Sequence, residues 1–247
     1  MEHIEALRAE GVLLADAARR AALSDPVPSC PDWDVGDLVT HTGQVHRWAK
    51  AYIAGRRTKA MSADEEEDAW GPEPSDDQLI EWFVEGHADL VAALIDAPDD
   101  LDCWSFLPAP SPRAFWARRQ AHETAIHRVD AQTAIGAITP FAPAFAADGI
   151  DELLSGFFAR RGRGPRVDVD CTLLISTTDT GQSWHVRIGP AGYLTTRDGG
   201  TADCSVSGRA SDIYLLLWNR GTPEALTVGG DAGVLGRWRK GATIRWS

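Results

Sequence analysis

Apolar residues recur at helical spacing through the first 160 residues of the chain. The spacing predicts four amphipathic helices: one ending before Asp25-Pro26, one starting at Asp34, one from near Ser75 to Leu94, and one from Arg113 to about Thr133. Asp34 and Asp37 have the spacing of a capping box. A further helix is predicted over 148–160. Four amphipathic segments predict a four-helix bundle, a fold that builds metal sites from facing helices.

Beyond a segment with Gly and Pro at 160–165, which we interpret as a linker, the period changes to alternation. Strands are predicted at 167–173, 184–188, 193–196 and 202–206, separated by turns that contain glycine. This pattern predicts an antiparallel meander, followed by a helix at 211–219, a short strand at 226–228 and a closing helix at 231–240. The sequence therefore predicts two domains, a helical bundle over 1–160 and a small antiparallel α+β domain over 165–247.

Composition is that of a folded chain rather than a disordered one, since 44% of its 247 residues are hydrophobic. The net charge of −12 argues against a nucleic-acid-binding surface, which needs clustered Lys and Arg. Part of this acidity lies in the run 63–68, which we expect to be a solvated loop without function. The N-terminal residues do not have the pattern of a signal peptide, and no apolar stretch approaches the ~20 residues that span a bilayer. We therefore expect a cytoplasmic protein without a membrane partner.

The four cysteines are dispersed without a C-x-x-C pair, at Cys30, Cys103, Cys171 and Cys204. In a reducing compartment the expected state is four free thiols. No cysteine is placed by a motif to act as a nucleophile. If the chemistry needs a thiol, we expect a cofactor to supply it.

Glu123 and His127 are the candidate site residues with the clearest local pattern. Positions i and i+4 of a helix share one face, so this carboxylate and this imidazole can bind one metal ion. His41, on the second predicted helix, is the best third ligand. A His/Glu/His site that leaves one position open is typical of catalytic zinc.

Simpler interpretations exist for each of these residues. Glu123 and His127 also have the spacing of a solvated i,i+4 pair, and His41 shares its helical face with apolar residues, as a core histidine does. His122-Glu123 begins like the H-E-x-x-H motif of metalloproteases, but position 126 is Ile, so this motif is not present.

The wider sequence around both segments resembles a known family. The segment 27–48, with Cys30-Pro31-Asp32-Trp33 before Asp37-Leu38-Val39-Thr40-His41, and the segment 118–130 resemble the two signatures of the mycothiol-dependent maleylpyruvate isomerase family. Asp32 departs from the family, where glycine is common. The resemblance implies a DinB-like four-helix bundle and a sterol-carrier-like second domain with an apolar cleft. It also implies a divalent metal, usually zinc, on His41, Glu123 and His127.

The resemblance further implies mycothiol as the thiol cosubstrate and a small electrophilic molecule as substrate. A metal lowers the pKa of a thiol, and the thiolate is a strong nucleophile. We expect either an isomerase or an S-transferase. Arg220, after the apolar helix, is our catalytic candidate for an anionic substrate or enolate; its simpler role is to neutralise the C-terminal end of that helix.

Neighbouring residues have expected supporting roles. Arg119 either orients Glu123 or forms a plain i,i+4 ion pair with it, and Asp130 is expected to accept the other ring proton of His127. By helical phase, His46 and His122 point away from the ligand faces.

Two other function classes fit the same sequence. A hydrolase would use zinc-bound hydroxide at an identical site. A binding or regulatory protein would use the bundle and cleft with a structural metal, for which Cys30 could supply a fourth ligand, or with none. The chain is expected to be a monomer or a homodimer.

Overall fold

The computed structural model describes residues 3–160 and 164–242 of the chain. Contacts divide the chain into two compact units, Glu2–Thr139 and Pro140–Ser247, which we call the N-terminal and the C-terminal unit. Within the described residues, no helix combines the length and apolar character needed to cross a membrane.

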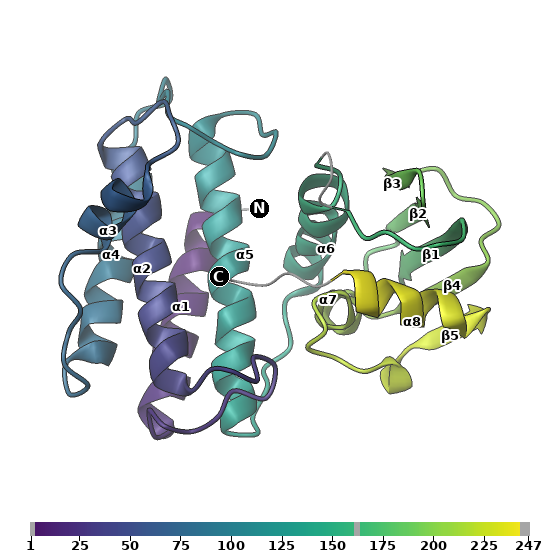
Figure 1. Ribbon diagram of the computed structural model, residues 1–247, viewed down its shortest axis with the longest axis horizontal. Coiled ribbons are helices and arrows are strands. Elements are labelled where there is room, and N and C mark those ends of the chain that lie inside the picture. The colour runs from purple at the N-terminus through teal and green to yellow at the C-terminus, as the bar shows by residue number, and fades with distance from the viewer. Residues whose placement is uncertain (1–2, 161–163, 243–247) are drawn as a thin grey trace. The chain divides into compact units, whose positions relative to one another are not determined.

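The N-terminal unit is a helical bundle, as the sequence predicted. Four long helices run side by side, and a short fifth helix lies against α2 (Figure 1). The helices are α1 (His3–Arg20), α2 (Val35–Ala54), α3 (Ala63–Trp70), α4 (Leu79–Asp96) and α5 (Pro112–Ala134). Their apolar faces bury a core that includes Leu14, Leu38, Phe83 and Leu90.

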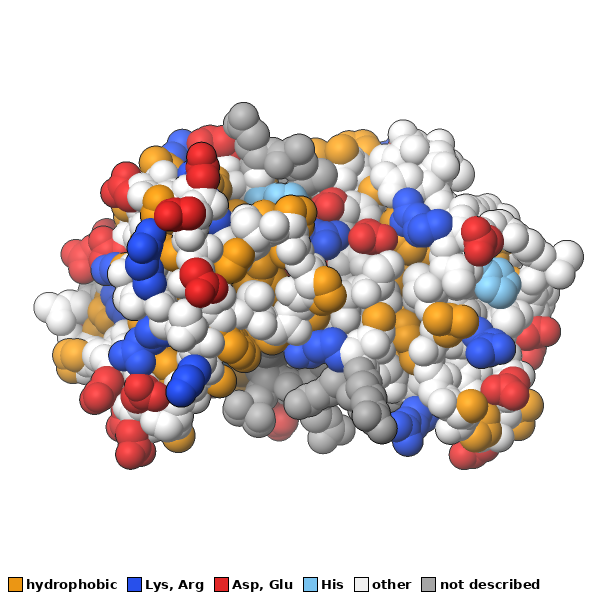
Figure 2. All heavy atoms as spheres, turned by 90° about the horizontal axis from the view of Figure 1, so that it is seen from above, with side chains coloured by type: hydrophobic (Ala, Val, Ile, Leu, Met, Phe, Trp, Pro, Cys, Tyr) orange, Lys and Arg blue, Asp and Glu red, His pale blue; other side chains and the backbone are white. Residues whose placement is uncertain are grey.

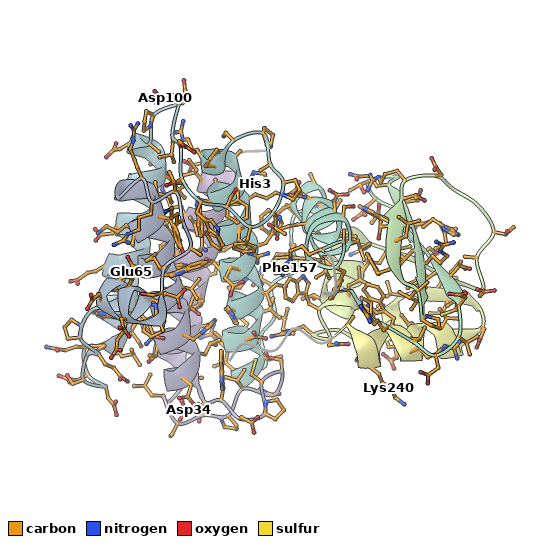
Figure 3. All side chains as sticks on the ribbon, turned by 45° about the horizontal axis from the view of Figure 1, so that its top comes forward. His3, Asp34, Glu65, Asp100, Phe157 and Lys240 are labelled. Carbon is orange, nitrogen blue, oxygen red and sulfur yellow. The ribbon has the colours of Figure 1, made fainter. Side chains whose placement is uncertain are left out.

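The start of α2 is fixed by a local sequence signal. The Asp34 side chain accepts a hydrogen bond from the Asp37 backbone N–H at 2.9 Å, and the Asp37 carboxylate accepts from the Asp34 N–H at 3.1 Å. This confirms the predicted capping box, which satisfies amide groups that the first helical turn leaves unpaired. Asp34, labelled in Figure 3, therefore fixes the residue at which α2 begins.

The acidic run at 63–68 was wrongly predicted to be a loop, because it forms most of α3. Ser62 and Glu65 form a second capping box, and three acidic residues in the first turn interact favourably with the positive end of the helix dipole. Glu65 pairs with Arg57 at 2.8 Å, and Glu66 accepts from Trp48 Nε1 at 3.0 Å. A cap and two tertiary contacts thus stabilise a short helix that has no buried residue of its own.

The C-terminal unit is an α+β fold with a mixed sheet (Figure 1). Its elements are α6 (Pro143–Asp151), the π-helix η1 (Glu152–Phe157), β1 (Cys171–Thr177), β2 (Ser183–Gly189), β3 (Gly192–Thr196), β4 (Cys204–Gly208), α7 (Ala210–Leu217), the 3₁₀ turn η2 (Pro223–Ala225), β5 (Thr227–Gly230) and α8 (Ala232–Gly241). The helix predicted at 148–160 therefore corresponds to the last residues of α6 followed by the π-helix η1.

The predicted all-antiparallel meander is wrong in one pairing. The strand order is β3-β2-β1-β4-β5, and β1 pairs with β4 in parallel, with Leu173 opposite Cys204. The connection after β3 carries the chain back across the sheet, so that β4 pairs with the free side of β1. Alternating burial specifies which face of a strand is buried, but not the direction of its neighbour.

The division between the units lies earlier than the predicted linker, between Thr139 and Pro140. Residues 140–160 belong to the C-terminal unit because α6 packs on α7, and the ring of Phe141, just before α6, lies 5.2 Å from that of Tyr214 on α7. The Tyr193 hydroxyl of β3 donates to the Leu154 carbonyl of the π-helix at 2.8 Å. Contact of this helical segment with the sheet unit cannot be inferred from its own periodicity.

Candidate metal centre

Two neighbouring antiparallel helices, α2 and α5, bring the three predicted ligands together. His41 lies in the second turn of α2, and Glu123 and His127 lie one turn apart on α5. His41 Nε2 is 3.7 Å from Glu123 Oε1, and His127 Nε2 is 3.2 Å from the same oxygen. One ligand atom of each residue lies within 4.8 Å of those of the other two. Two imidazole nitrogens and one carboxylate oxygen thus converge on one point.

Burial distinguishes this group from a solvated surface pair. The side chains of His127 and Glu123 are 0% and 4% exposed, whereas that of His41 is 21% exposed. The His41 and His127 rings meet edge to face, with centroids 5.1 Å apart. The group is therefore closed on the α5 side and accessible beside His41.

Two further side chains hold Glu123 and His127 in this orientation. Arg119 Nη2 donates to Glu123 Oε2 at 3.0 Å, so that the other carboxylate oxygen, Oε1, faces the two histidines. His127 Nδ1 pairs with Asp130 Oδ2 at 3.0 Å, which directs Nε2 toward Glu123. Both contacts were predicted from the sequence. A carboxylate behind a histidine fixes the tautomer in which Nε2 carries the lone pair for a metal.

The loop at 27–34 contributes contacts that the sequence interpretation missed. Ser29 Oγ donates to Asp130 Oδ1 at 2.5 Å. The Trp33 ring lies 4.9 Å from that of His41 and stacks on that of His127 at 6.0 Å. In the sequence, only their proximity to the Asp34 cap could have indicated Ser29 and Trp33, because the α5 residues that they contact lie about a hundred residues away.

Cys30 lies in the same loop, and its position bears on the possibility of a fourth ligand. Its Sγ is 3.9 Å from Asp130 Oδ2. Asp130 binds the Nδ1 side of His127, whereas the convergence point is on the Nε2 side. Cys30 therefore contacts the residue that supports the candidate ligand, and this geometry does not favour it as a fourth ligand.

The charges of the group are strongly coupled. Burial opposes ionisation of Glu123, but the hydrogen bond with His127 and the nearby His41 ring hold its pKa far below the usual value. Burial also opposes protonation of His127, yet Asp130 and Glu123 on either side raise its pKa to about 9. Burial is the main reason that the pKa of His41 is lowered. Without a metal, His127 is therefore protonated, and the positively charged ring lies between the carboxylates of Asp130 and Glu123.

This donor set fits a divalent metal of the zinc type. Imidazole nitrogen and carboxylate oxygen are zinc ligands, and three protein ligands leave a position for a substrate or water. The proton on His127 is the charge that a cation would replace. His41, Glu123 and His127 are the residues that could hold such an ion.

The other sequence candidates lie outside this group. His46 Nε2 pairs with Thr124 Oγ1 at 2.8 Å, and the His122 ring contacts His3 at 6.1 Å, so both point away, as predicted. Arg220 belongs to the C-terminal unit, where its Nη1 donates to the Trp218 carbonyl at 2.9 Å, just after α7. This contact is the simpler helix-end interaction, and the catalytic role of Arg220 stays a prediction.

A cavity of about 480 Å³ lies on the C-terminal unit, lined by Arg166, Val167, Asp168, Val169, Arg237, Lys240 and Gly241. Three of these residues are cationic. It does not correspond to the apolar cleft that the resemblance implies, and that cleft stays a prediction.

The fold and the clustered side chains define a class of protein: a helical bundle with a candidate His/Glu/His metal centre, followed by an α+β unit with a mixed sheet. Two family models match the chain, the mycothiol maleylpyruvate isomerase N-terminal domain at residues 4–132 and the corresponding C-terminal domain at residues 144–237. The chain belongs to the mycothiol-dependent maleylpyruvate isomerase family.

Solved structures agree with this fold. The chain is similar to a crystal structure of the mycothiol-dependent maleylpyruvate isomerase, with 16% sequence identity, a TM-score of 0.62 and 92% of each chain covered. A histidine-to-alanine mutant of that enzyme matches with the same values. At this identity the likeness shows the fold. A comparison with curated proteins gave no match.

Proposed function

We propose that this chain is a metal-dependent and thiol-dependent isomerase or S-transferase. In this proposal His41, Glu123 and His127 hold zinc, mycothiol is the cosubstrate, and a small electrophile is the substrate. The observation that carries the proposal is the convergence of three ligand atoms within 4.8 Å of one another, with His41 partly exposed. Family membership supports mycothiol as the thiol.

Zinc bound there would supply a positive charge that lowers the pKa of a thiol to near neutrality. The residues of the chain prepare the place for it. Asp130 holds the proton on His127 Nδ1, so that Nε2 faces inward, and Arg119 holds one oxygen of Glu123. The Trp33 ring packs against the His41 ring and stacks on the His127 ring, which helps to hold both imidazoles in place.

The reaction class follows from thiolate chemistry. A thiolate that adds to a cis double bond conjugated to a carbonyl converts it to a single bond, which rotates. Expulsion of the thiolate from the resulting enolate then gives the trans product, whereas protonation of the enolate at carbon retains the thiol as a thioether. Arg220 remains our candidate for binding an anionic substrate.

Elemental analysis tests the metal site first. We expect about one zinc per chain in the wild type after dialysis without chelator, and its loss in both His41→Ala and Glu123→Ala. Circular dichroism of each variant establishes that the bundle is intact. A wild type that cannot be loaded with zinc, nickel or cobalt would contradict the proposal and favour a metal-free binding protein.

Activity measurements then separate the reaction classes. The zinc-loaded protein is incubated with mycothiol and unsaturated oxoacids, and products are separated by chromatography. A trans isomer with the thiol regenerated supports an isomerase, and a stable thioether supports an S-transferase. Hydrolysis of esters or amides without any thiol would contradict both and identify a hydrolase.

A further inference from the structure

Gln120 on α5 is a buried polar side chain that the proposed site does not use. Its exposure is 1%, and its Oε1 atom has no hydrogen-bond partner among the described residues. Leaving such an acceptor unpaired costs roughly 1–3 kcal/mol. A buried amide oxygen without a partner is a candidate ligand contact.

Two contacts between α2 and α5 locate Gln120. His41 faces Glu123 at 3.7 Å, and farther along both helices the Trp48 and Trp116 rings lie 5.0 Å apart. Gln120 lies between Trp116 and Glu123 on α5. It lies three positions before Glu123, which is a rise of about 4.5 Å and a rotation of about 60° around the helix. It therefore lies one turn from the candidate metal ligands, on the same side of α5.

The opposing side of α2 is half-buried at this level. His41, Gln44, Val45 and Trp48 form a half-buried stripe, whereas the flanking residues Thr42, Gly43, His46 and Ala49 are buried. We call this stripe, with Trp116, Gln120 and Glu123 opposite, the α2–α5 seam. A ligand whose end lies beside His41 can extend along the seam past Gln120.

We propose that Gln120 binds the acylamino group of the thiol cosubstrate. This inference rests on the proposed function. In an N-acylcysteine, three bonds separate the sulfur from the amide nitrogen, a span comparable with the rise of about 4.5 Å between Glu123 and Gln120. With the sulfur at the ligands, the N–H reaches Gln120 Oε1. An acylamino group carries both a donor and an acceptor, so it pairs with either rotation of the Gln120 amide.

The test compares two neutral thiols that differ only in this group, N-acetylcysteine methyl ester and methyl 3-mercaptopropanoate. Each is titrated into the cobalt-loaded protein, and the thiolate-to-cobalt charge-transfer absorption gives its Kd. Wild type is compared with Gln120→Met, which keeps the length and removes the amide. Gln44→Met, in the same seam but half-buried, is the matched control. Because each thiol is compared with itself across proteins, differences in thiol acidity cancel.

We expect the preference for the acylamino thiol to fall about tenfold in Gln120→Met and to stay unchanged in Gln44→Met. Cobalt content and melting temperature are measured for each protein. An unchanged preference in Gln120→Met, or an equal loss in both variants, overturns the role of Gln120 alone. Absence of the charge-transfer band with either thiol in the wild type overturns the proposed function as well.

A wild-type measurement keeps the inference testable if Gln120→Met does not fold. In the N-methylated analogue of the acylamino thiol, a methyl group replaces the hydrogen of the N–H donor. We expect it to bind about tenfold more weakly than its parent. Equal affinity of the two thiols for the wild-type protein overturns the assignment.

Discussion

Metal binding to the His41/Glu123/His127 group should displace a proton, and Asp130 should determine how strongly that proton competes. The pKa of His127 is raised to about 9 by Asp130 and Glu123, against the opposing effect of burial. A metal needs the Nε2 lone pair, so the proton must leave. His41, whose pKa is lowered by burial, is neutral at pH 7 and releases none.

The size of this effect follows from the pKa. At pH 7 the protonated form of His127 is about 100-fold more populated than the neutral form, because its pKa of about 9 lies about two units above that pH. Apparent zinc affinity should therefore rise about tenfold per pH unit from pH 6 to 8 and level off near pH 9. The competition at pH 7 corresponds to about 2.7 kcal/mol of binding free energy.

Isothermal titration calorimetry measures both quantities. Zinc is titrated into the metal-free protein at pH 7 in buffers of different ionisation enthalpy, which gives the number of protons released. We expect close to one proton in the wild type. In Asp130→Asn the release should fall, because the carboxylate that raises the His127 pKa is gone.

Apart from the change in proton release, Asp130→Asn should also bind zinc more weakly than the wild type. An asparagine can donate to His127 Nδ1 and so stabilise the tautomer that carries its proton on Nε2, with a cost of about 10–100-fold in affinity. Zinc-bound water can also lose a proton, but that proton does not depend on Asp130 in this way. An affinity independent of pH between 6 and 8, or equal release in both proteins, would refute the reasoning.

Two further predictions concern stability. Burial, and then the neighbouring His87, lowers the pKa of His46 well below its ordinary value, so the unfolded chain binds the extra proton and stability is lost as pH falls below about 6.5. Urea unfolding should show a loss of up to about 2 kcal/mol between pH 6.5 and 5 that is absent in His46→Gln; identical pH dependence would contradict this. Gly43→Ala should destabilise the protein by about 1–3 kcal/mol, because its new methyl group would meet the Trp82 ring. Gly236→Ala, in open space on α8, is the matched control and should stabilise by about 0.5–1 kcal/mol in the same assay.

Surface charge gives no comparable signal of function. Acidic and basic side chains are interspersed over the face of the N-terminal unit seen in Figure 2. Many of them pair locally, as Arg19 does with Glu81 at 2.7 Å and Lys50 with Asp89 at 2.5 Å. Exposed pairs of this kind contribute about 0–1 kcal/mol each. The polar groups that carry the proposals lie in the interior.

Local signals in the sequence were enough to predict the helices and the candidate ligands. The Asp34–Asp37 cap depends only on residues three apart, so it fixed the start of α2 and the turn that carries His41. Glu123, His127 and Asp130 share one side of α5 because of helical periodicity alone. The family resemblance then identified His41 as their partner, which spacing could only suggest.

Contacts between distant segments could be decided only by the tertiary structure. Ser29 and Trp33 reach α5 across about a hundred residues, and whether the Gln120 amide oxygen has a partner depends on the side chains that surround it. The parallel pairing of β1 with β4 likewise depends on the path of a connection. Periodicity specifies which face of an element is buried. It does not specify which partner covers that face, because burial is a property of the whole packed chain.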